Sequence, residues 1–187
     1  KDPTLLLKHT NDVDTTKLLL QLNADPNTKN KYGSTPLHLA SIYEQVETVR
    51  LLLQSSADPN TKDKDGETPI HWASRGQVGT ARLLLQANAD PNNKNNAGNT
   101  PLHWASTYGY VDMARLLLQA NADPNNKNNY GNTPLHWAST YGYVDMARLL
   151  LQFKVDPNPK NKYGSTPHRC ALNHEIKQLL ESKMQIE

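Results

Sequence analysis

Cysteine, net charge and long apolar runs are all scarce in this sequence. Its 187 residues include one cysteine, Cys170, so an internal disulfide is excluded. A formal net charge of +2 is far from the strongly basic balance typical of nucleic-acid-binding domains. No apolar run is long enough to span a membrane, and the first residues do not resemble a signal peptide. We therefore expect no membrane contact.

Signatures of catalysis are missing as well. The sequence contains no nucleophile elbow and no glycine loop of the kind that holds phosphate groups, and no zinc-ligand spacing surrounds Cys170. We therefore expect no catalytic residue, no cofactor and no metal site. The chain is predicted not to be an enzyme.

What is present is a six-residue motif that returns at a fixed interval. Residues 100–105 read TPLHWA, and variants begin at Thr35, Thr68, Thr133 and Thr166. From one motif to the next the steps are 33, 32, 33 and 33 residues. A period of this length indicates stacked supersecondary units rather than a conventional globular core.

Residues 94–126 show the pattern of one unit. Thr100 can cap a short first helix that has Pro101 at its first position and ends near Gly109. A second helix is predicted at 111–119, and Asn121 can end it in a left-handed conformation. The predicted buried stripe of this helix consists of Val111, Ala114, Leu117 and Leu118. Turn-forming residues at 95–98 predict a short hairpin tip before the first helix.

This arrangement closely resembles the ankyrin repeat, which carries T-P-L-H near its start and LLL followed by A-D-x-N near its end. The resemblance covers essentially the whole chain. It implies an all-α repeat solenoid, in which helix-turn-helix units carry projecting β-hairpin loops. We expect one domain over residues 1–187, with full repeats at 29–61, 62–93, 94–126 and 127–159, an N-terminal capping repeat at 1–28 and a C-terminal capping repeat at 160–187. With both ends capped, a monomer is expected.

Three departures from the family pattern bear on local structure. The glycine that usually follows the second helix is replaced by Asn23, Ser56, Asn88, Asn121 and Lys154. Lys154 is the poorest substitute, so we expect strain or a different helix exit there. Repeat 62–93 lacks one residue between its helices, which predicts a tightened turn. Residues 86–118 and 119–151 are identical except for Ala97 against Tyr130.

Histidines and lysines also recur in register. His38, His71, His103 and His136 stand one repeat apart, roughly 8–10 Å, which is too far to share a zinc ion. By resemblance they are structural and hydrogen-bond to the hairpin backbone. Lysines at 29, 62, 94, 127 and 160 form a ladder, and arginines at 50, 82, 115 and 148 form another. An opposing aspartate ladder runs alongside, so solvated, mutually compensating faces are favoured over an anion-binding face.

Aromatic residues form the most informative pattern. Trp104 and Tyr108 stand four residues apart on one predicted helix face, as do Trp137 and Tyr141. Trp72 lacks a tyrosine partner because its repeat is one residue shorter. Stacking would turn these side chains into a stripe of roughly 20 Å, which is about the length of six extended residues. Each indole has a competing interpretation as a packed part of the scaffold, whereas the tyrosines are expected to be exposed.

In ankyrin proteins the first helices and the hairpin tips line a concave face that binds partners. By this resemblance the expected partner-binding residues are Tyr32, Tyr43, Trp72, Arg75, Asn96, Trp104, Tyr108, Asn129, Tyr130, Trp137, Tyr141 and Tyr163. The same face is expected to include Lys31, Ser34, Lys64, Asp65, Glu67, Asn99, Thr107, Asn132, Thr140 and Lys162. Large aromatic anchors among adaptable polar groups are typical of a recognition surface.

The leading hypothesis is a non-enzymatic protein-interaction module that binds a protein or an extended peptide on its concave face. Its Asn- and Lys-rich composition suggests an intracellular protein, cytoplasmic or exported into a host cell by an intracellular microbe. One alternative is a targeting or scaffold domain excised from a larger enzyme or regulator, because the chain begins at Lys1 rather than Met. Another is binding of an anionic ligand or nucleic acid along the lysine ladder, which the balanced charge disfavours.

Overall fold

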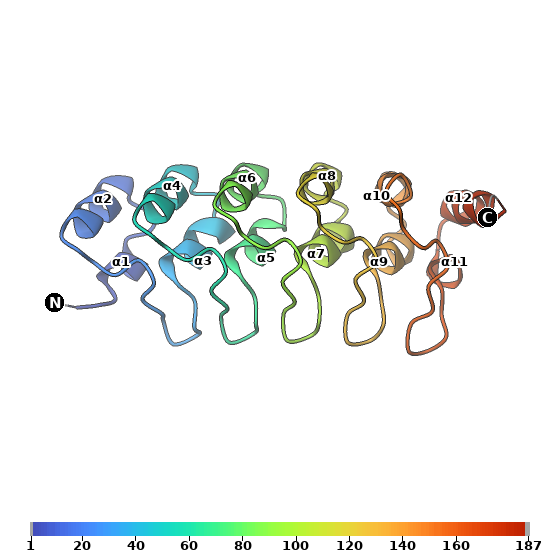
Figure 1. Cartoon of the computed structure of the whole chain (residues 1–187), viewed down its shortest axis with the longest axis horizontal. Coiled ribbons are helices and arrows are strands. Elements are labelled where there is room, and N and C mark those ends of the chain that lie inside the picture. Colours follow the sequence, from blue (N-terminus) through green and yellow to red (C-terminus); the bar gives the residue numbers. More distant parts are fainter. Residues whose placement is uncertain (1, 186–187) are drawn as a thin grey trace.

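The computed structural model describes residues 2–185, and its units stand side by side in an elongated row (Figure 1). Each unit contributes a first and a second helix. The first helices are α1 (Leu5–Lys8), α3 (Pro36–Ile42), α5 (Pro69–Ala73), α7 (Pro101–Tyr108), α9 (Pro134–Thr140) and α11 (Pro167–Cys170). The second helices are α2 (Val13–Gln21), α4 (Val46–Gln54), α6 (Val78–Gln86), α8 (Val111–Gln119), α10 (Val144–Leu150) and α12 (His174–Met184). The predicted helical repeat array is confirmed.

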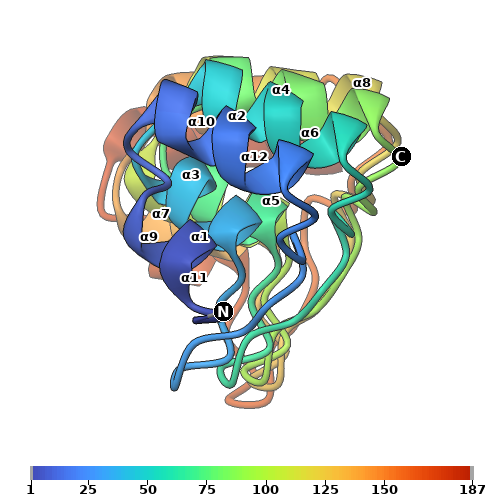
Figure 2. The same cartoon turned by 90° about the vertical axis from the view of Figure 1, so that its left-hand side faces the viewer.

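Tight loops project from the first-helix side of the row (Figures 1 and 2). In the loop before α7, the Asn95 amide donates to the Asn99 carbonyl over 2.9 Å. The side-chain oxygen of Asn95 also accepts hydrogen bonds from the amides of Ala97 and Asn99. No strand occurs within residues 2–185, so the expected β-hairpins are instead turns held by these local bonds.

The Thr-Pro-x-His motif starts each inner first helix through a reciprocal cap. The Thr100 amide donates to Nδ1 of His103 at 3.0 Å, while the Thr100 side chain accepts from the helix backbone. Since Nδ1 accepts a backbone N–H, the ring proton lies on Nε2, which donates to the Asn132 carbonyl of the next repeat at 3.0 Å. The histidine therefore joins two repeats, as the structural interpretation predicted.

All four motif histidines are almost completely buried, and burial lowers their pKa. The effect brings the pKa of His71 and of His103 to about 4. A proton added at Nδ1 would also point at the backbone N–H of the motif threonine, which now donates its hydrogen bond to Nδ1. These histidines are consequently neutral parts of the scaffold at pH 7.

The core runs continuously along the row, between the two layers of helices. On α8, Ala114, Leu117 and Leu118 are buried as predicted, but Val111 is only partly buried. Met113, which the predicted stripe left out, is completely buried. Because α8 packs against α7 and against the second helices on both sides, its buried face is wider than a single stripe.

Asparagine side chains connect the repeats on the side where the second helices end. The amide nitrogen of Asn92 donates to the Asn121 carbonyl at 3.0 Å, and its oxygen accepts from the Asp123 amide at 2.8 Å. The same pair of bonds is made by Asn27, Asn60 and Asn125. These asparagines therefore fix the spacing between neighbouring repeats.

The backbone conformation after each second helix depends on which residue replaces the usual glycine. Asn23, Ser56, Asn88 and Asn121 all adopt positive φ values, between 59° and 67°. Lys154 does not, and α10 ends at Leu150, two residues before the position that corresponds to the end of α8. The different exit predicted at Lys154 is confirmed.

The shortened repeat has the tightened turn that was predicted. Its first helix, α5, has 5 residues against 8 in α7. Gly76 follows it with φ of 120°, a conformation that side chains rarely adopt.

The two end units differ in polarity. At the N-terminal end, Leu18 and Leu22 are each 55% exposed, and a groove of about 340 Å³ is lined by Leu5, Leu19 and Leu22 among others. At the C-terminal end, the exposed positions of α12 are mostly polar. The N-terminal unit is therefore more apolar on its surface than a capping repeat requires, and its capping role stays a prediction.

Candidate functional site

Two rows of aromatic side chains occupy consecutive repeats. Row 1 consists of Trp104, Tyr108 and Tyr110, and row 2 of Trp137, Tyr141 and Tyr143. In both rows the indole stacks on the first tyrosine, with ring centroids 6.1 Å apart and ring planes 17° or 19° apart. The second tyrosine lies 6.0 or 6.2 Å further and is tilted by 38° or 33°. Such offset contacts are favourable beyond the area they bury.

The tyrosines of the rows are exposed and the indoles are half-buried. Tyr108 and Tyr141 are 46% and 51% exposed, as predicted. Tyr110 and Tyr143 are also exposed but were missed, because they lie in the turn after the first helix, where helical spacing does not apply. The repeated Tyr-Gly-Tyr sequence was the signal that could have identified them.

A glycine allows each row to contact the preceding repeat. Gly109 has φ of 72°, and a methyl group placed there would lie 2.9 Å from the Tyr143 ring. At Gly76, the corresponding distance to the Tyr110 ring is 3.3 Å. The last ring of each row therefore lies over the backbone of its neighbour, and this joins row 2 to row 1.

A buried carboxylate holds the indole of row 1. Glu67 is 4% exposed. Its Oε1 accepts a hydrogen bond from Nε1 of Trp104 at 3.0 Å and another from the side-chain amide of Asn95. The Arg75 guanidinium lies 3.7 Å from the other carboxylate oxygen. It also lies over two rings, 4.0 Å from the centroid of Trp72 and 4.7 Å from that of Trp104.

The same cluster determines the ionisation of Glu67. Burial raises the pKa of the Glu67 carboxyl, while the Asn95 bond, Arg75 and the Trp104 bond each oppose the shift. Trp72 is fixed by a second carboxylate, since its Nε1 donates to Asp63 at 3.1 Å. These contacts make Trp72, Arg75 and Trp104 parts of a packed cluster.

The indole of row 2 has no such anchor. Asn99 occupies the position of Glu67, and its side-chain oxygen accepts instead from Asn128 at 2.9 Å. Within residues 2–185, Nε1 of Trp137 donates to no protein atom, and it is not buried. Two repeats of nearly identical sequence therefore present their tryptophans differently.

The remaining predicted residues lie on the loops or at a helix end. Tyr32, Tyr130 and Tyr163 are exposed at loop tips, and Tyr43 is 71% exposed after α3. The amides of Asn96 and Asn129 donate to the backbone of the preceding loop, to Lys64 at 2.8 Å and to Asn96 at 2.9 Å. The structure thus gives these two asparagines a role in loop stacking, and their contact with a partner stays a prediction.

The lysine ladder is tied to the backbone. The Lys94 ammonium donates to the Lys127 carbonyl at 2.9 Å, and the ammonium groups of Lys29, Lys62 and Lys127 make the equivalent bond to the next repeat. No ion pair joins this ladder to the aspartates within residues 2–185. One donor of each of these ammonium groups is therefore occupied by the scaffold.

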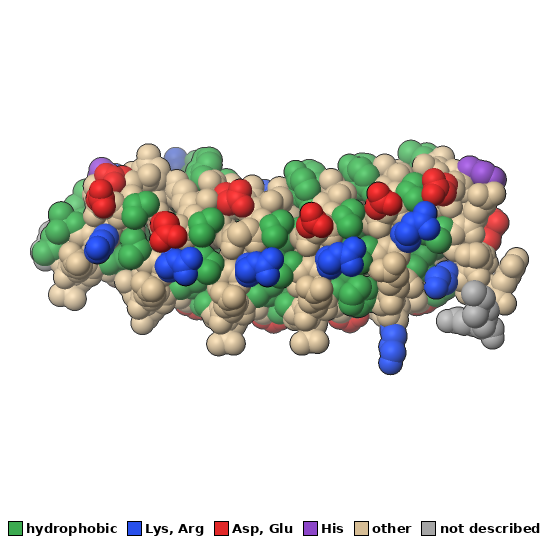
Figure 3. Space-filling model, turned by 90° about the horizontal axis from the view of Figure 1, so that it is seen from above, with side chains coloured by type: hydrophobic (Ala, Val, Ile, Leu, Met, Phe, Trp, Pro, Cys, Tyr) green, Lys and Arg blue, Asp and Glu red, His purple; other side chains and the backbone are tan. Residues whose placement is uncertain are grey.

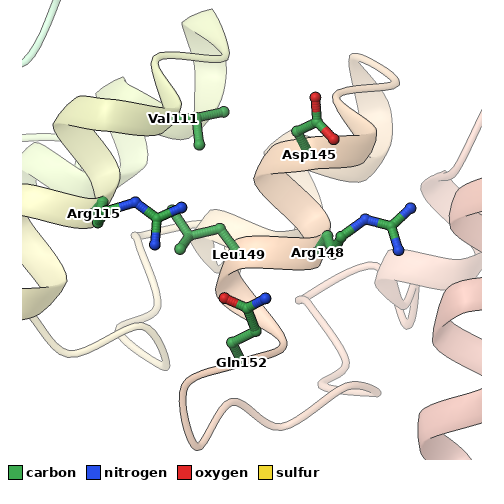
Figure 4. A pocket seen from close by; sticks show the side chains of 6 residues that line it. All are labelled: Val111, Arg115, Asp145, Arg148, Leu149 and Gln152. Atoms are coloured by element: carbon green, nitrogen blue, oxygen red, sulfur yellow. The ribbon is translucent and has the colours of Figure 1, made fainter.

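The face formed by the second helices carries mixed charge. Figure 3 shows basic and acidic side chains interspersed along it. A groove of about 270 Å³ between α8 and α10 is lined by Arg115, Asp145, Arg148 and Gln152, with Val111 and Leu149 between them (Figure 4). A similar groove lies between α6 and α8. Its recurrence shows that the groove follows from helix spacing, and no residue of the aromatic rows lines it.

Residues 2–185 contain no group of three His, Cys, Asp or Glu side chains placed to hold a metal ion. None of their helices combines the length and the apolar character needed to cross a membrane.

Comparison with known proteins agrees with the geometry. The family model for ankyrin repeats, which spans three copies, matches four overlapping stretches at residues 5–95, 56–128, 84–161 and 121–187. A search of the curated proteins finds no match. The matched stretches together extend over nearly the whole chain. The chain belongs to the ankyrin-repeat family.

Proposed function

We propose that this chain is a non-enzymatic interaction module whose aromatic rows bind a partner protein or an extended peptide. Ankyrin repeats are generally protein–protein interaction modules. The observation that carries the placement is the pair of consecutive rows, each with two exposed tyrosines stacked beside a half-buried indole. Tyrosine and tryptophan supply large contact areas at low entropic cost and are enriched in binding hot spots.

The arrangement of the elements supports a site on the concave face. The rows belong to α7, α9 and the turns that follow them. Viewed along the row, the first helices and the loops lie together below the layer of second helices (Figure 2). A partner on this side would reach the rows and the tyrosines of the loop tips together. An intracellular location, or export into a host cell, rests on composition alone and is part of this proposal.

The test replaces the two most exposed tyrosines of the rows. Tyr108→Ala with Tyr141→Ala should abolish capture of a partner from a cell extract, because it removes contact area without removing a buried contact. The matched control is Arg82→Ala with Arg115→Ala, two changes on the face of the second helices, and it should leave capture unchanged. Far-UV circular dichroism checks that both variants keep their helices. Capture that survives the tyrosine changes would overturn this placement, and its loss in the arginine control would move the site to the second helices.

A further inference from the structure

The partner surface around the aromatic rows is rich in amides rather than charges. In the loops before α7 and α9, the positions of Asp63 and Glu67 are taken by Asn95 and Asn99, and then by Asn128 and Asn132. Asn128 is buried, whereas the other three side chains are partly exposed beside the rows. Row 1 borders the Glu67–Arg75 cluster, in which the two charges face each other. A partner segment that crosses both rows therefore meets rings and neutral polar groups, so it does not require charge of either sign.

The rows recur at a distance that favours one backbone conformation. Neighbouring packed helices lie about 8–10 Å apart, and each row occupies one such step. A polyproline II segment completes a turn in three residues of about 3.1 Å, or roughly 9 Å. A β-strand presents side chains on one face at about 6.7 Å intervals, which does not match this step. A polyproline II segment lying along the array could thus place one proline ring on each row.

Trp137 adds a donor to this surface. Its Nε1 makes no hydrogen bond within residues 2–185 and is not buried, whereas Nε1 of Trp104 is bonded to Glu67. Polyproline II backbone has no internal hydrogen bonds, so its carbonyl groups are free to accept. The carbonyl groups of a helical partner are already paired within the helix. An accessible indole N–H without a protein acceptor therefore favours an extended, proline-containing segment over a helix.

We infer that the segment bound by the rows is an uncharged, proline-rich peptide in polyproline II conformation, with prolines three residues apart. The prolines stack on the tyrosines of rows 1 and 2, and one peptide carbonyl accepts from Nε1 of Trp137. This inference rests on the proposed function, because it names the chemistry of the partner at the same site.

The test is selection from a random 12-residue peptide library displayed on phage, with the whole chain as the target. Selected peptides should carry prolines at three-residue spacing. Binding of a selected peptide, synthesised and titrated by calorimetry, should weaken about tenfold in Trp137→Phe, which keeps the ring but removes the donor. In the matched Trp104→Phe variant affinity should change by less than about twofold, because that donor serves Glu67. Urea unfolding verifies that both variants fold.

Two results would overturn the inference. The first is a selection that yields no peptide, or peptides without the proline spacing. The second is a loss of affinity that is larger in Trp104→Phe than in Trp137→Phe. If either result accompanies tyrosine-dependent capture of a protein from extract, the proposed function stands and only the partner chemistry is wrong. If capture is also unchanged in the variant that lacks both tyrosines, the proposed site itself is wrong.

Discussion

The indole of Trp104 donates a 3.0 Å hydrogen bond to the buried carboxylate of Glu67, which belongs to the preceding repeat. Trp137 occupies the same position in a repeat of nearly the same sequence, but the preceding repeat offers it Asn99, whose oxygen is already bonded to Asn128. The role of a residue in this array is therefore decided by its own repeat together with the one before it. Trp104 is held by the scaffold, whereas the Trp137 N–H bonds to no protein atom within residues 2–185.

Removing the Glu67 carboxylate should destabilise the array more than removing its counterpart. Glu67→Ala leaves three polar groups without their partner, those of Trp104, Asn95 and Arg75, and should lower the free energy of unfolding by about 2–4 kcal/mol. Asn99→Ala removes one neutral acceptor and should cost about 1 kcal/mol. Urea denaturation of both variants measures the difference, and equal losses would show that the Glu67 cluster adds no more stability than the bond between Asn99 and Asn128.

Two glycines with the same backbone conformation should respond differently to a methyl group. Gly109 and Gly142 have φ of 72° and 74°. An added Cβ at Gly109 would lie 2.9 Å from the Tyr143 ring, while at Gly142 the nearest atom is 3.9 Å away, on Asn173. Gly142→Ala should cost about 1–2 kcal/mol through left-handed strain alone. Gly109→Ala should cost about 1–3 kcal/mol more, since the ring must move.

Chemical denaturation of these two alanine variants gives the comparison directly. Near-UV circular dichroism should in addition change for Gly109→Ala and stay unchanged for Gly142→Ala, because only the former displaces an aromatic ring. Indistinguishable stabilities and spectra would contradict the contact between row 2 and the preceding repeat.

The buried histidines should make the fold less stable as the pH falls below 6.5, well before ordinary carboxylates are protonated. The pKa of His71 and of His103 falls from 6.5 to about 4 on folding. The unfolded chain therefore binds more protons between these limits, so stability is full above pH 6.5 and declines as the pH falls toward 4. Between pH 7.5 and 5 each of the two should account for a loss of about 2 kcal/mol.

Urea midpoints at several pH values between 7.5 and 5 provide the measurement. Glu67, whose pKa is raised by burial, acts in the opposite direction, because the folded chain takes up its proton first. In His103→Gln the amide can replace both ring contacts but cannot titrate, so the decline with pH should be shallower. A urea midpoint that stays constant as the pH is lowered from 7.5 to 5 would contradict neutral buried histidines.

The end of the second helix should depend on a residue that tolerates positive φ. Asn121 has φ of 66°, whereas Lys154 at the equivalent position does not adopt a positive φ and α10 ends early. Asn121→Lys should shorten α8 and lower the free energy of unfolding by about 1 kcal/mol. The reverse change, Lys154→Asn, should leave stability equal or higher. Amide chemical shifts of residues 118–122 report the helix end, and unchanged shifts in Asn121→Lys would contradict this explanation.

The helices could be predicted from the sequence because their signals are local. Thr100 with Pro101 marks the start of α7, and Asn121 marks the end of α8. Spacing excluded a metal site shared by His103 and its neighbours, since one repeat step is too long, and the resemblance to ankyrin repeats implied the structural role of this histidine. Its neutral state follows from burial, which only the structure shows. The prediction of β-hairpins was wrong, because no strand forms within residues 2–185. The loop asparagines instead close turns with side-chain hydrogen bonds.

The site was only partly predictable because its decisive contacts cross between repeats. The exposure of Tyr108 follows from helical spacing, but whether Trp104 is anchored depends on what residue 67 is and how Arg75 lies over the rings. The sequence did not predict Tyr143 as part of the site, because this side chain reaches the preceding repeat from a turn. The sequence also showed the regular spacing of the lysines, but not that their ammonium groups donate to backbone carbonyls of the next repeat.

The most direct measurement of the central claim is NMR of the three indole N–H groups, in protein labelled with 15N, while the captured partner is added. The account predicts that the Trp137 resonance shifts strongly, whereas those of Trp72 and Trp104, bonded to Asp63 and Glu67, shift little. A Trp137 resonance that stays unchanged at saturation, with shifts confined to the side chains of Arg82 and Arg115, would contradict it.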